Sequence, residues 1–349
     1  MTRAQLNILD LVPVAAGSTA ADAINSTVEL AQHAEQWGYG RYWMAEHHNM
    51  HGVASSSTAV LIGHVADATS TIRVGAGGIM LPNHAPYVIA EQFGTLATMH
   101  PGRIDLGLGR APGTDQPTAR ALRRNELAAT NFAGEVEELL GYLGDPDPDA
   151  TVRAIPGEGT HVPVWILGSS HGGAQVAAAL GLPYSFASHF APQALLSALE
   201  LYRRQFQPSR HPQGLDAPRT MAGANVMVAD TEAEAERLFT STVERFHSIV
   251  TGRRTTLQPP TGDLGDLMSS WTPAERAAVA DMLRVSFVGT PGQVRDALGQ
   301  FTEATGVDEV ILACAAFDPE ARLRSYELLA EAWHEPVPSA EPAPERVHP

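Results

Sequence analysis

The sequence predicts a single (β/α)8 barrel, that is, a ring of eight parallel strands alternating with helices. Strand-like and helix-like stretches alternate along almost all of the 349 residues, which fits a barrel better than an open doubly wound sheet. The runs 164–167 and 310–313 are continuously apolar, as expected of parallel strands that are buried on both faces. The length lies within the range of one large barrel.

The first half of the chain contains four of the expected strand–helix pairs. We expect strands at residues 5–12, 39–45, 71–81 and 103–109, and helices at 20–37, 55–69, 86–100 and a region that includes 135–143. Gly38 ends the first helical pattern, and serine and threonine residues supply a start signal for the second. The acidic, proline-containing stretch 145–150 is predicted to be a solvent-exposed loop.

The second half continues the alternation with two interruptions. We expect strands at 162–167, 184–187, 219–229 and 309–313, and helices at 173–180, 192–206, 231–250, 293–305 and 319–333. Residues 251–284, first polar and proline-containing and then helical, are predicted to be an insertion before the last helix–strand unit. The Pro-, Glu- and Ala-rich tail 336–349 is predicted to be disordered. Residues 1–335 are therefore expected to form one barrel domain.

The composition argues against several classes of partner. Hydrophobic residues make up 44% of the chain and charged residues 18%, which is sufficient for a large core. The net charge of −16 disfavours nucleic acid and anionic membranes as partners, because both require a basic surface. Cys314 is the single cysteine, so an internal disulfide and a cysteine-based zinc or iron–sulfur site are excluded. A reducing cytoplasm is the location that this predicts.

The N-terminal segment has some features of a signal peptide, but its apolar run is interrupted. Asn7, Asp10 and Pro13 lie within it, so we expect a buried first strand instead of a cleavable leader. Elsewhere the chain has no segment with the ~18–20 uninterrupted apolar residues of a membrane span.

The stretch Ala45-Glu46-His47-His48-Asn49 lies at the C-terminal end of the second predicted strand. In barrel enzymes the active-site side chains lie at these strand ends. A carboxylate beside an imidazole orients a proton acceptor and tunes it near neutral pH. Glu46 and His47 are therefore candidate catalytic residues. His48 and Asn49 are expected to be supporting polar residues, and for these two a hydrogen-bonded polar turn is the alternative.

A metal site is the other interpretation of this stretch. His47 and His51 have the four-residue spacing of two ligands on a helix. The stretch follows a strand, however, and its glutamate precedes the histidine pair instead of lying between two histidines. We therefore predict no metal.

Glycines occur inside the third predicted strand and at the end of the fourth. Gly77 and Gly78 lie inside the third strand, where glycine weakens pairing unless another group approaches the backbone or the strand bulges. Gly109 ends the fourth strand and is followed by Arg110, so a flat ligand could approach there and the arginine could hold an anion. A tight loop with a solvated arginine is the alternative.

The fifth unit joins an apolar strand to a helix through the stretch 168–174, GSSHGGA. Small residues and hydroxyls at a helix N-terminus form an anion site from free backbone N–H groups and the helix dipole. Ser169, Ser170 and Gly173 are therefore candidate phosphate-binding residues, with an ordinary N-cap serine as the alternative. Together these stretches predict a barrel enzyme that binds a flat, phosphorylated cofactor close to His47.

Several of these motifs, in this order and spacing, resemble the bacterial luciferase-like flavin monooxygenases. The resemblance is carried by YWMAEHHN, IRVGAGGIMLPNHAP, AEQFGTLATMHPGRIDLGLGRAPG and VPVWILGSSHGGAQVAAALGLPYSFASHF, and it covers most of residues 7–332. It implies a (β/α)8 barrel that binds reduced FMN or, in some branches, the deazaflavin F420.

The resemblance also implies roles for individual residues. Glu46 and His47 match the pair beside the isoalloxazine ring, with His47 as catalytic base. Gly77 and Gly78 match a small pair against the ring, where family members often have a bulge or a non-prolyl cis peptide. Arg110 matches an arginine near the flavin phosphate; the phosphate loop is matched by Ser170 with the backbone of Gly173.

Gly109 departs from luciferase, which has a reactive cysteine at that position, so light emission with long-chain aldehydes is not expected.

The implied reaction instead uses O2 and reduced FMN to oxygenate an apolar small molecule through a C4a-peroxyflavin. We expect the pocket to include Met44 and Met80. The substrate class extends to aromatic polyketides and other secondary metabolites.

A separate flavin reductase is expected to supply reduced FMN, because the chain has no nicotinamide-binding motif. The resemblance further implies a homodimer and a lid within residues 251–284. Two alternatives remain: an F420-dependent oxidoreductase that transfers hydride, and a non-catalytic flavin-binding protein. Glu46, His47 and Arg110 argue against the second.

Overall fold

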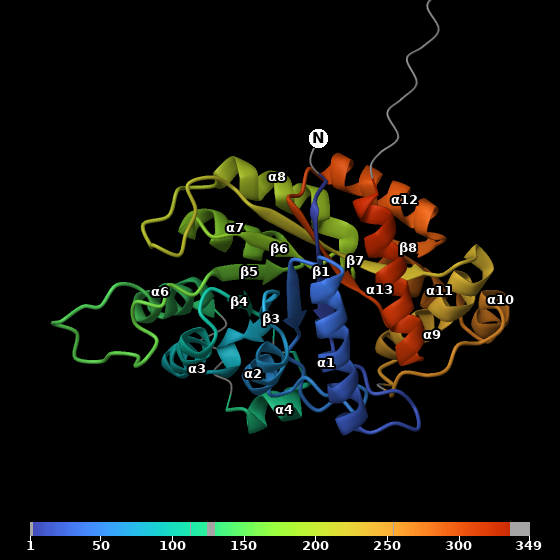
Figure 1. Ribbon diagram of the computed structural model, residues 1–349, viewed down its shortest axis with the longest axis horizontal. Coiled ribbons are helices and arrows are strands. Elements are labelled where there is room, and N and C mark those ends of the chain that lie inside the picture. Colours follow the sequence, from blue (N-terminus) through green and yellow to red (C-terminus); the bar gives the residue numbers. More distant parts are fainter. Residues whose placement is uncertain (1–2, 112, 124–129, 254, 336–349) are drawn as a thin grey trace, which may run out of the picture.

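A computed structural model describes residues 3–111, 113–123, 130–253 and 255–335 (Figure 1). Eight parallel strands close into a barrel, because β1 pairs with β9, β9 with β7, and β7 with β6. In ring order they are β1 (Gln5–Asp10), β2 (Arg41–Met44), β3 (Arg73–Met80), β4 (Ile104–Gly109), β5 (Val164–Gly168), β6 (Tyr184–Phe186), β7 (Thr220–Val228) and β9 (Glu309–Ala313). The predicted fold class is confirmed.

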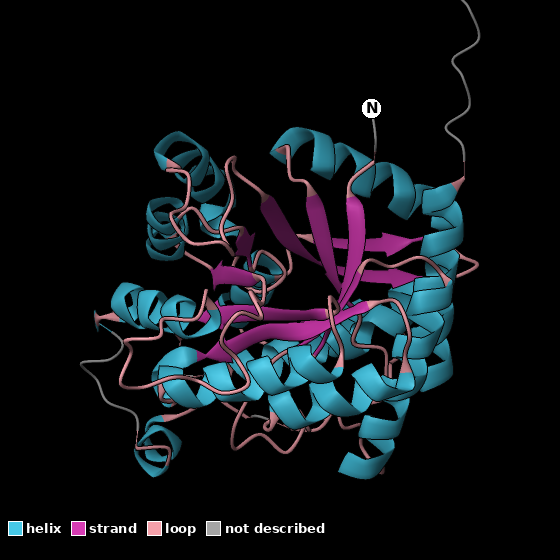
Figure 2. Ribbon diagram, turned by 60° about the vertical axis from the view of Figure 1, so that its left-hand side comes forward, coloured by secondary structure: helices cyan, strands magenta, loops and turns pink. Residues whose placement is uncertain are grey.

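Helices surround the barrel on its outside (Figure 2). They are α1 (Ala20–Gln36), α2 (Thr58–Ala68), α3 (Pro86–Met99), α4 (Gln116–Ala121), α6 (Phe132–Leu143), α7 (His171–Leu180), α8 (Leu195–Gln205), α9 (Glu232–Val250), α12 (Pro291–Thr305) and α13 (Pro319–His334). The predicted helix 192–206 is divided into a 3-10 turn, Pro192–Ala194, and α8. None of the described helices combines the length and the hydrophobicity that a membrane crossing requires.

The predicted insertion contains two short helices and leads into a strand that was not predicted. Helices α10 (Leu264–Met268) and α11 (Pro273–Met282) are followed by β8 (Ser286–Gly289). This strand pairs with the last residues of β7, beyond most of those that pair with β9, so it extends the sheet without entering the ring. Four residues, three of them only partly buried, give neither a continuous apolar run nor a clear alternation. The predicted disordered tail, 336–349, lies outside the described residues.

Local sequence signals account for several helix ends. Thr19 accepts from the backbone of Asp22, whose side chain accepts in turn from the Thr19 backbone, and this capping box begins α1. Gly181 and Gly306 end α7 and α12 in the left-handed conformation, with φ of 63° and 60°.

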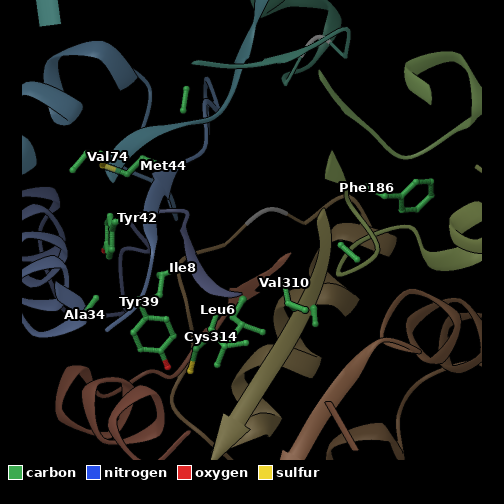
Figure 3. Packing of buried hydrophobic residues seen from close by; sticks show 14 of the residues in the cluster. Leu6, Ile8, Ala34, Tyr39, Tyr42, Met44, Val74, Phe186, Val310 and Cys314 are labelled. Carbon is green, nitrogen blue, oxygen red and sulfur yellow. The ribbon is translucent and has the colours of Figure 1, made fainter. Parts of the chain in front are cut away.

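Alternating residues on the strands build two separate hydrophobic layers. The larger layer lies between the strands and the helices, where Ile8, Tyr42, Met44 and Val74 pack with Ala34 of α1 (Figure 3). The smaller layer fills the barrel lumen and consists of Leu9, Trp43, Ala45, Trp165, Met221 and Ile311. Met44 therefore faces the helices, and the prediction that it lines a pocket at the barrel mouth is wrong, because its neighbour Trp43 takes the lumen side.

Buried charges close the N-terminal end of the barrel. Arg41, the first residue of β2, contacts Asp105 at 2.5 Å and Glu309 at 2.8 Å. Arg73 contacts the other oxygen of Asp105 at 2.5 Å, and Arg219 contacts Glu309 at 2.6 Å. We call these five residues the barrel floor. They fill the lower lumen, so space for a ligand is expected at the opposite, C-terminal end.

Candidate active site

Small residues make up most of the uppermost lumen layer, at the C-terminal ends of the strands. Directly below it, Trp43 and Trp165 meet edge to face with ring centroids 5.5 Å apart. At or directly after the ends of the strands, at positions that face the lumen by alternation, lie Ala45, Gly77, Gly109, Ala187, Gly223 and Ala313, together with the larger Leu11 and Leu167. Because most of this layer is glycine or alanine, a flat group at the mouth could lie against it.

The glycine pair of β3 forms a bulge at this level. The Gly77–Gly78 peptide bond is cis, and the register between β3 and β4 shifts between Ala76 and Ile79. A Cβ on Gly77 would lie 2.7 Å from Leu9 Cδ1, and one on Gly78 would lie 2.6 Å from a backbone oxygen of Gly107. Gly78 is therefore restricted to glycine by the close approach of backbone, whereas a Cβ on Gly77 would require the Leu9 side chain to move.

Glu46 is held by groups from both sides of the mouth. Its carboxylate accepts hydrogen bonds from His48 Nε2 at 2.8 Å, from His84 Nε2 at 2.9 Å and from the Met80 backbone N–H at 3.1 Å. Asn83 adds a longer contact at 3.4 Å. Glu46 thereby ties the end of β2 to the segment that follows the β3 bulge.

The partners of Glu46 keep it ionised. Burial by itself raises the pKa of Glu46, but hydrogen bonds from His48 and His84, the charge of His84 and the Met80 N–H outweigh it and lower the pKa to about 2. Glu46 is therefore an acceptor at all physiological pH values, and a proton-shuttling role for Glu46 itself is disfavoured.

Glu46→Gln should remove stabilisation that depends on pH. The shift from 4.5 to about 2 corresponds to roughly 3 kcal/mol. Because the folded pKa is the lower one, this contribution is present above pH 4.5 and is lost as the pH falls toward 2. Urea unfolding at pH 7 and at pH 3 should show a large loss in the variant at pH 7 and a loss of less than half that size at pH 3. A loss that does not change with pH would contradict this account.

His47 lies beside the lumen without using Glu46 as its partner. Its backbone N–H donates to the Ser55 carbonyl at 3.3 Å, and its ring Nδ1 lies 3.5 Å from the Gly113 carbonyl oxygen. The hydrogen-bond partners of Glu46 are His48 and His84, so the adjacent glutamate and histidine predicted from sequence do not pair with each other. The structure places His48, which was predicted as a supporting residue, directly on the carboxylate.

Two histidines of the mouth were not predicted from the sequence. His84 follows β3 within LPNHAP and contacts Glu46; His189 follows β6 within SFASHF and lies over Gly223. Both meet the criterion that selected His47, a polar residue soon after a strand of the barrel. Applying that criterion to every strand would have found them.

The described residues contain no group of three or more histidine, cysteine, aspartate or glutamate side chains that could hold a metal ion.

The end of β5 and the start of α7 form a candidate anion site. Ser170 is the N-cap residue of α7, but its side chain makes no capping hydrogen bond. Arg110 follows β4 and lies beside the first turn of α7. Both terminal nitrogens of its guanidinium are 3.5 Å from the position that a Cβ on Gly172 would take. Gly173 approaches Gly168 closely, because its Cβ would be 3.3 Å from the Gly168 Cα. The guanidinium of Arg110 therefore lies beside the first turn of α7, where the helix has N–H groups without intrahelical partners.

The remaining predicted residues lie around the same rim. Ser169 and Ser170 are exposed, and Gly109 lies under Met80, whose sulfur would be 3.2 Å from a Cβ on that glycine. The end of β2, the bulge of β3, Arg110 after β4 and the serines after β5 stand on four consecutive strands of the ring. The structure thus gathers all the predicted residues on one half of the mouth, with the anion site at one end and His47 at the other.

These residues fit a flat cofactor with a phosphate. The glycine and alanine layer offers space for the ring, and the α7 N-terminus with Arg110 offers donors and positive charge for the phosphate.

Comparisons with known proteins give consistent results over most of the chain. A family model described as luciferase-like monooxygenase matches residues 5–309. The protein YvbT of Bacillus subtilis (strain 168) is 50% identical over 330 residues, which are 94% of this chain and 96% of that protein. A luciferase-like monooxygenase of Escherichia coli (strain K12) is 47% identical over 330 residues, 94% of this chain and 97% of that protein. The crystal structure of apo-MsnO8 matches with a TM-score of 0.85 and 36% identity, covering 95% of this chain and 98% of that one.

Proposed function

Because this chain belongs to the family of luciferase-like monooxygenases and is therefore an oxidoreductase, we propose that it uses reduced FMN and O2 to oxygenate an apolar organic molecule. One structural observation supports this cofactor independently of the family membership. A lumen layer of glycine and alanine lies next to an anion site made by Arg110 and the start of α7. A flavin mononucleotide has the matching shape, a flat ring joined to a phosphate by a short chain.

Two groups of residues would bind the two ends of the cofactor, its phosphate and its ring. Arg110, the hydroxyl groups of Ser169 and Ser170 and the N–H groups at the start of α7 would hold the phosphate. The cis Gly77–Gly78 bulge and Gly109 would let the ring lie against backbone, since neither position carries a Cβ. Bound reduced flavin would supply the electrons that activate O2.

His47 would transfer the proton, and Glu46 with its histidine partners would position the ring. His47 stands at the end of β2 beside the small-residue layer, within reach of a group placed there, and a positioned imidazole can take or give a proton near neutral pH. Glu46 would act as a positioning residue, because its oxygens are already occupied by His48, His84 and Met80. Met80, the two indoles and Leu167 would keep water away from the reacting atoms.

Several finer statements belong to the same proposal. The substrate would be an apolar small molecule, a separate reductase would supply the reduced FMN, and the active form would be a homodimer. Residues 251–284 would close over the mouth as a lid. An F420-dependent hydride transfer is the competing function, since F420 also carries a flat ring and a phosphate.

Identifying the cofactor tests this proposal directly. The protein is purified, its bound chromophore is released and identified by mass and absorbance, and the protein is then titrated with FMN and with F420 in their reduced forms. We expect FMN to bind more tightly, and oxygenated product to appear when a flavin reductase and O2 are supplied. Tight binding of F420 with no binding of FMN would reject the oxygenase in favour of hydride transfer. FMN bound without any oxygen consumption would favour a non-catalytic flavin protein.

Arg110→Ala should distinguish FMN from riboflavin. Charge-assisted hydrogen bonds to a phosphate contribute about 1.5–3 kcal/mol, so FMN affinity should fall about 10- to 100-fold while riboflavin affinity stays nearly constant. Titration of flavin fluorescence measures both. The matched control is Arg120→Ala, an exposed arginine of α4 that should change neither affinity. Equal losses for the two ligands would mean that Arg110 does not hold the phosphate.

A further inference from the structure

Helix α9 carries a positive charge that has no hydrogen-bonded or ion-paired partner among the described residues. Arg245 is mostly shielded from solvent, and its side chain makes no hydrogen bond or ion pair with any described residue. By contrast, Arg322 nearby contacts Asp10 at 2.6 Å and also donates to the Cys314 carbonyl. A shielded cation without a partner costs free energy, so a countercharge brought by a ligand is the natural way to satisfy it.

The neighbours of Arg245 on α9 place it above the barrel mouth. Thr242 donates to the Ala315 carbonyl beyond β9, at 3.4 Å. The Phe246 ring lies 6.5 Å from the Phe190 ring beyond β6. Arg245 is three residues after Thr242, so these two lie on the same side of the helix, and the charge of Arg245 acts on His189, which follows β6. Since β7 lies between β6 and β9 in the ring, Arg245 stands over the exit of β7.

The charges around Arg245 leave it positive. Asp10 is close enough to interact but is already engaged by Arg322, Tyr42 and Thr27. Burial, followed by the charge of Arg322, lowers the pKa of Arg245 to about 10, so the guanidinium remains protonated at neutral pH. Its five N–H donors form a planar fork that matches a carboxylate.

His189 completes this part of the mouth. Its ring lies over Gly223 of β7, where any Cβ would collide with it, and its Nδ1 is buried without a partner in the described structure. Asn225 holds its backbone carbonyl at 2.8 Å. Burial, then the charges of Arg245 and His47, lowers the pKa of His189 to about 4, so the ring is neutral and can donate one hydrogen bond.

This part of the mouth is separate from the anion site at α7. Arg110 and the α7 N-terminus follow β4 and β5, whereas Arg245 stands over β7 and β9, further around the ring. A flavin phosphate at α7 therefore leaves Arg245 without a counter-ion. Beside it, Phe246 and the half-exposed Phe190 offer an apolar wall.

We propose that Arg245, assisted by His189, binds the carboxylate of the substrate. The substrate is then not wholly apolar: it is an amphipathic organic acid, and only its apolar part packs on Phe190 and Phe246. One arginine beside a neutral imidazole matches a single negative charge. The identification of this acid as the substrate rests on the proposed oxygenase function, whereas the binding of the acid at Arg245 does not.

The test compares acids with uncharged amides of the same shape, using the flavin-free full-length protein. Octanoate is paired with octanamide, and phenylacetate with phenylacetamide, and binding is measured by calorimetry. For at least one pair the acid should bind about 10- to 100-fold more tightly than the amide. Arg245→Met should abolish this preference, and Arg245→Lys should keep part of it. The exposed Arg204→Met, on α8, is the matched control and should keep all of it.

A stability measurement separates binding from a structural role. Removing an unpaired, shielded cation should leave the thermal stability of the ligand-free Arg245→Met protein unchanged or raised. A clear loss of stability, an acid preference that survives Arg245→Met, or no acid preference in either pair would each overturn the inference. Because no flavin or turnover is involved, these outcomes are independent of whether FMN binds. A failure to bind FMN would instead reject the proposed function and leave the acid site standing.

Discussion

Replacing Arg41 by methionine is expected to destabilise the protein by about 3–5 kcal/mol, because it leaves two buried carboxylates of the barrel floor without their shared partner. Asp105 and Glu309 are 0% and 1% exposed, and Arg41 donates to both of them. The remaining arginines cannot replace it, since Arg73 contacts only Asp105 and Arg219 contacts only Glu309. Urea unfolding followed by tryptophan fluorescence measures the loss, as Trp43 and Trp165 pack directly above the floor.

Arg219→Met is the matched control for this prediction. It removes a partner of the same Glu309, but its side chain is 47% exposed, so a loss of only about 0–1 kcal/mol is expected. If Arg41→Met proves too unstable to purify, Asp105→Asn provides the complementary test by removing one of the two negative charges. Losses of equal size for Arg41 and Arg219 would show that the floor is not a buried ionic network.

The alternation of strands and helices was sufficient to predict the barrel. Each of the eight ring strands is a run of mostly buried residues, and at least one helix with a buried apolar face follows each strand along the chain, α6 in the case of β4. The strand β8 was not predicted, because its pairing with β7 is a tertiary effect. The end of β7 extends beyond the ring, and its free edge pairs there with the short β8.

The direction of single side chains was harder to predict than the elements. Met44 and Trp43 are both large and apolar, and only the register of β2 decides that Trp43 enters the lumen. The same holds at the mouth, where Glu46 and His47 are neighbours in sequence but point to different groups. Which residue meets the Glu46 carboxylate depends on the β3 bulge, which brings Met80 and His84 to it from a distant part of the chain.

Residue types at strand ends were nevertheless informative. Arg110, Ser170 and Gly173 lie together as an anion site, although they come from two different units of the barrel. Because the C-terminal ends of parallel strands meet at one rim, such residues can be grouped from the amino-acid sequence alone. Arg245 could not be found in this way. It lies in the middle of a helix, and its lack of a partner depends on which side chains the fold brings around it.

His47→Ala is expected to lower the rate of coupled oxygenation by about 10²–10⁴-fold, the usual contribution of a positioned acid or base. FMN affinity should change little, because the groups assigned to the phosphate and the ring are Arg110, the α7 N-terminus and the glycines of β3 and β4. Oxygen uptake should continue and yield H2O2 in place of oxygenated product, since the cofactor still reacts with O2 when proton transfer to the substrate fails. The measurement is the ratio of product formed to O2 consumed, together with the FMN dissociation constant.

Two comparisons make this prediction specific to His47. His51→Ala removes an exposed histidine of the same loop and should leave the coupling ratio intact. Glu46→Gln should weaken coupling through misplacement of His48 and His84, with a change in FMN affinity that His47→Ala does not share. A His47→Ala enzyme that remains fully coupled would assign this histidine to the structure of the loop. Activity that depends on added zinc would assign it to a metal. Because the Glu46 carboxylate is already satisfied by His48 and His84, loss of the His47 ring leaves no buried charge unpaired, and the expected loss is one of chemistry with the fold retained.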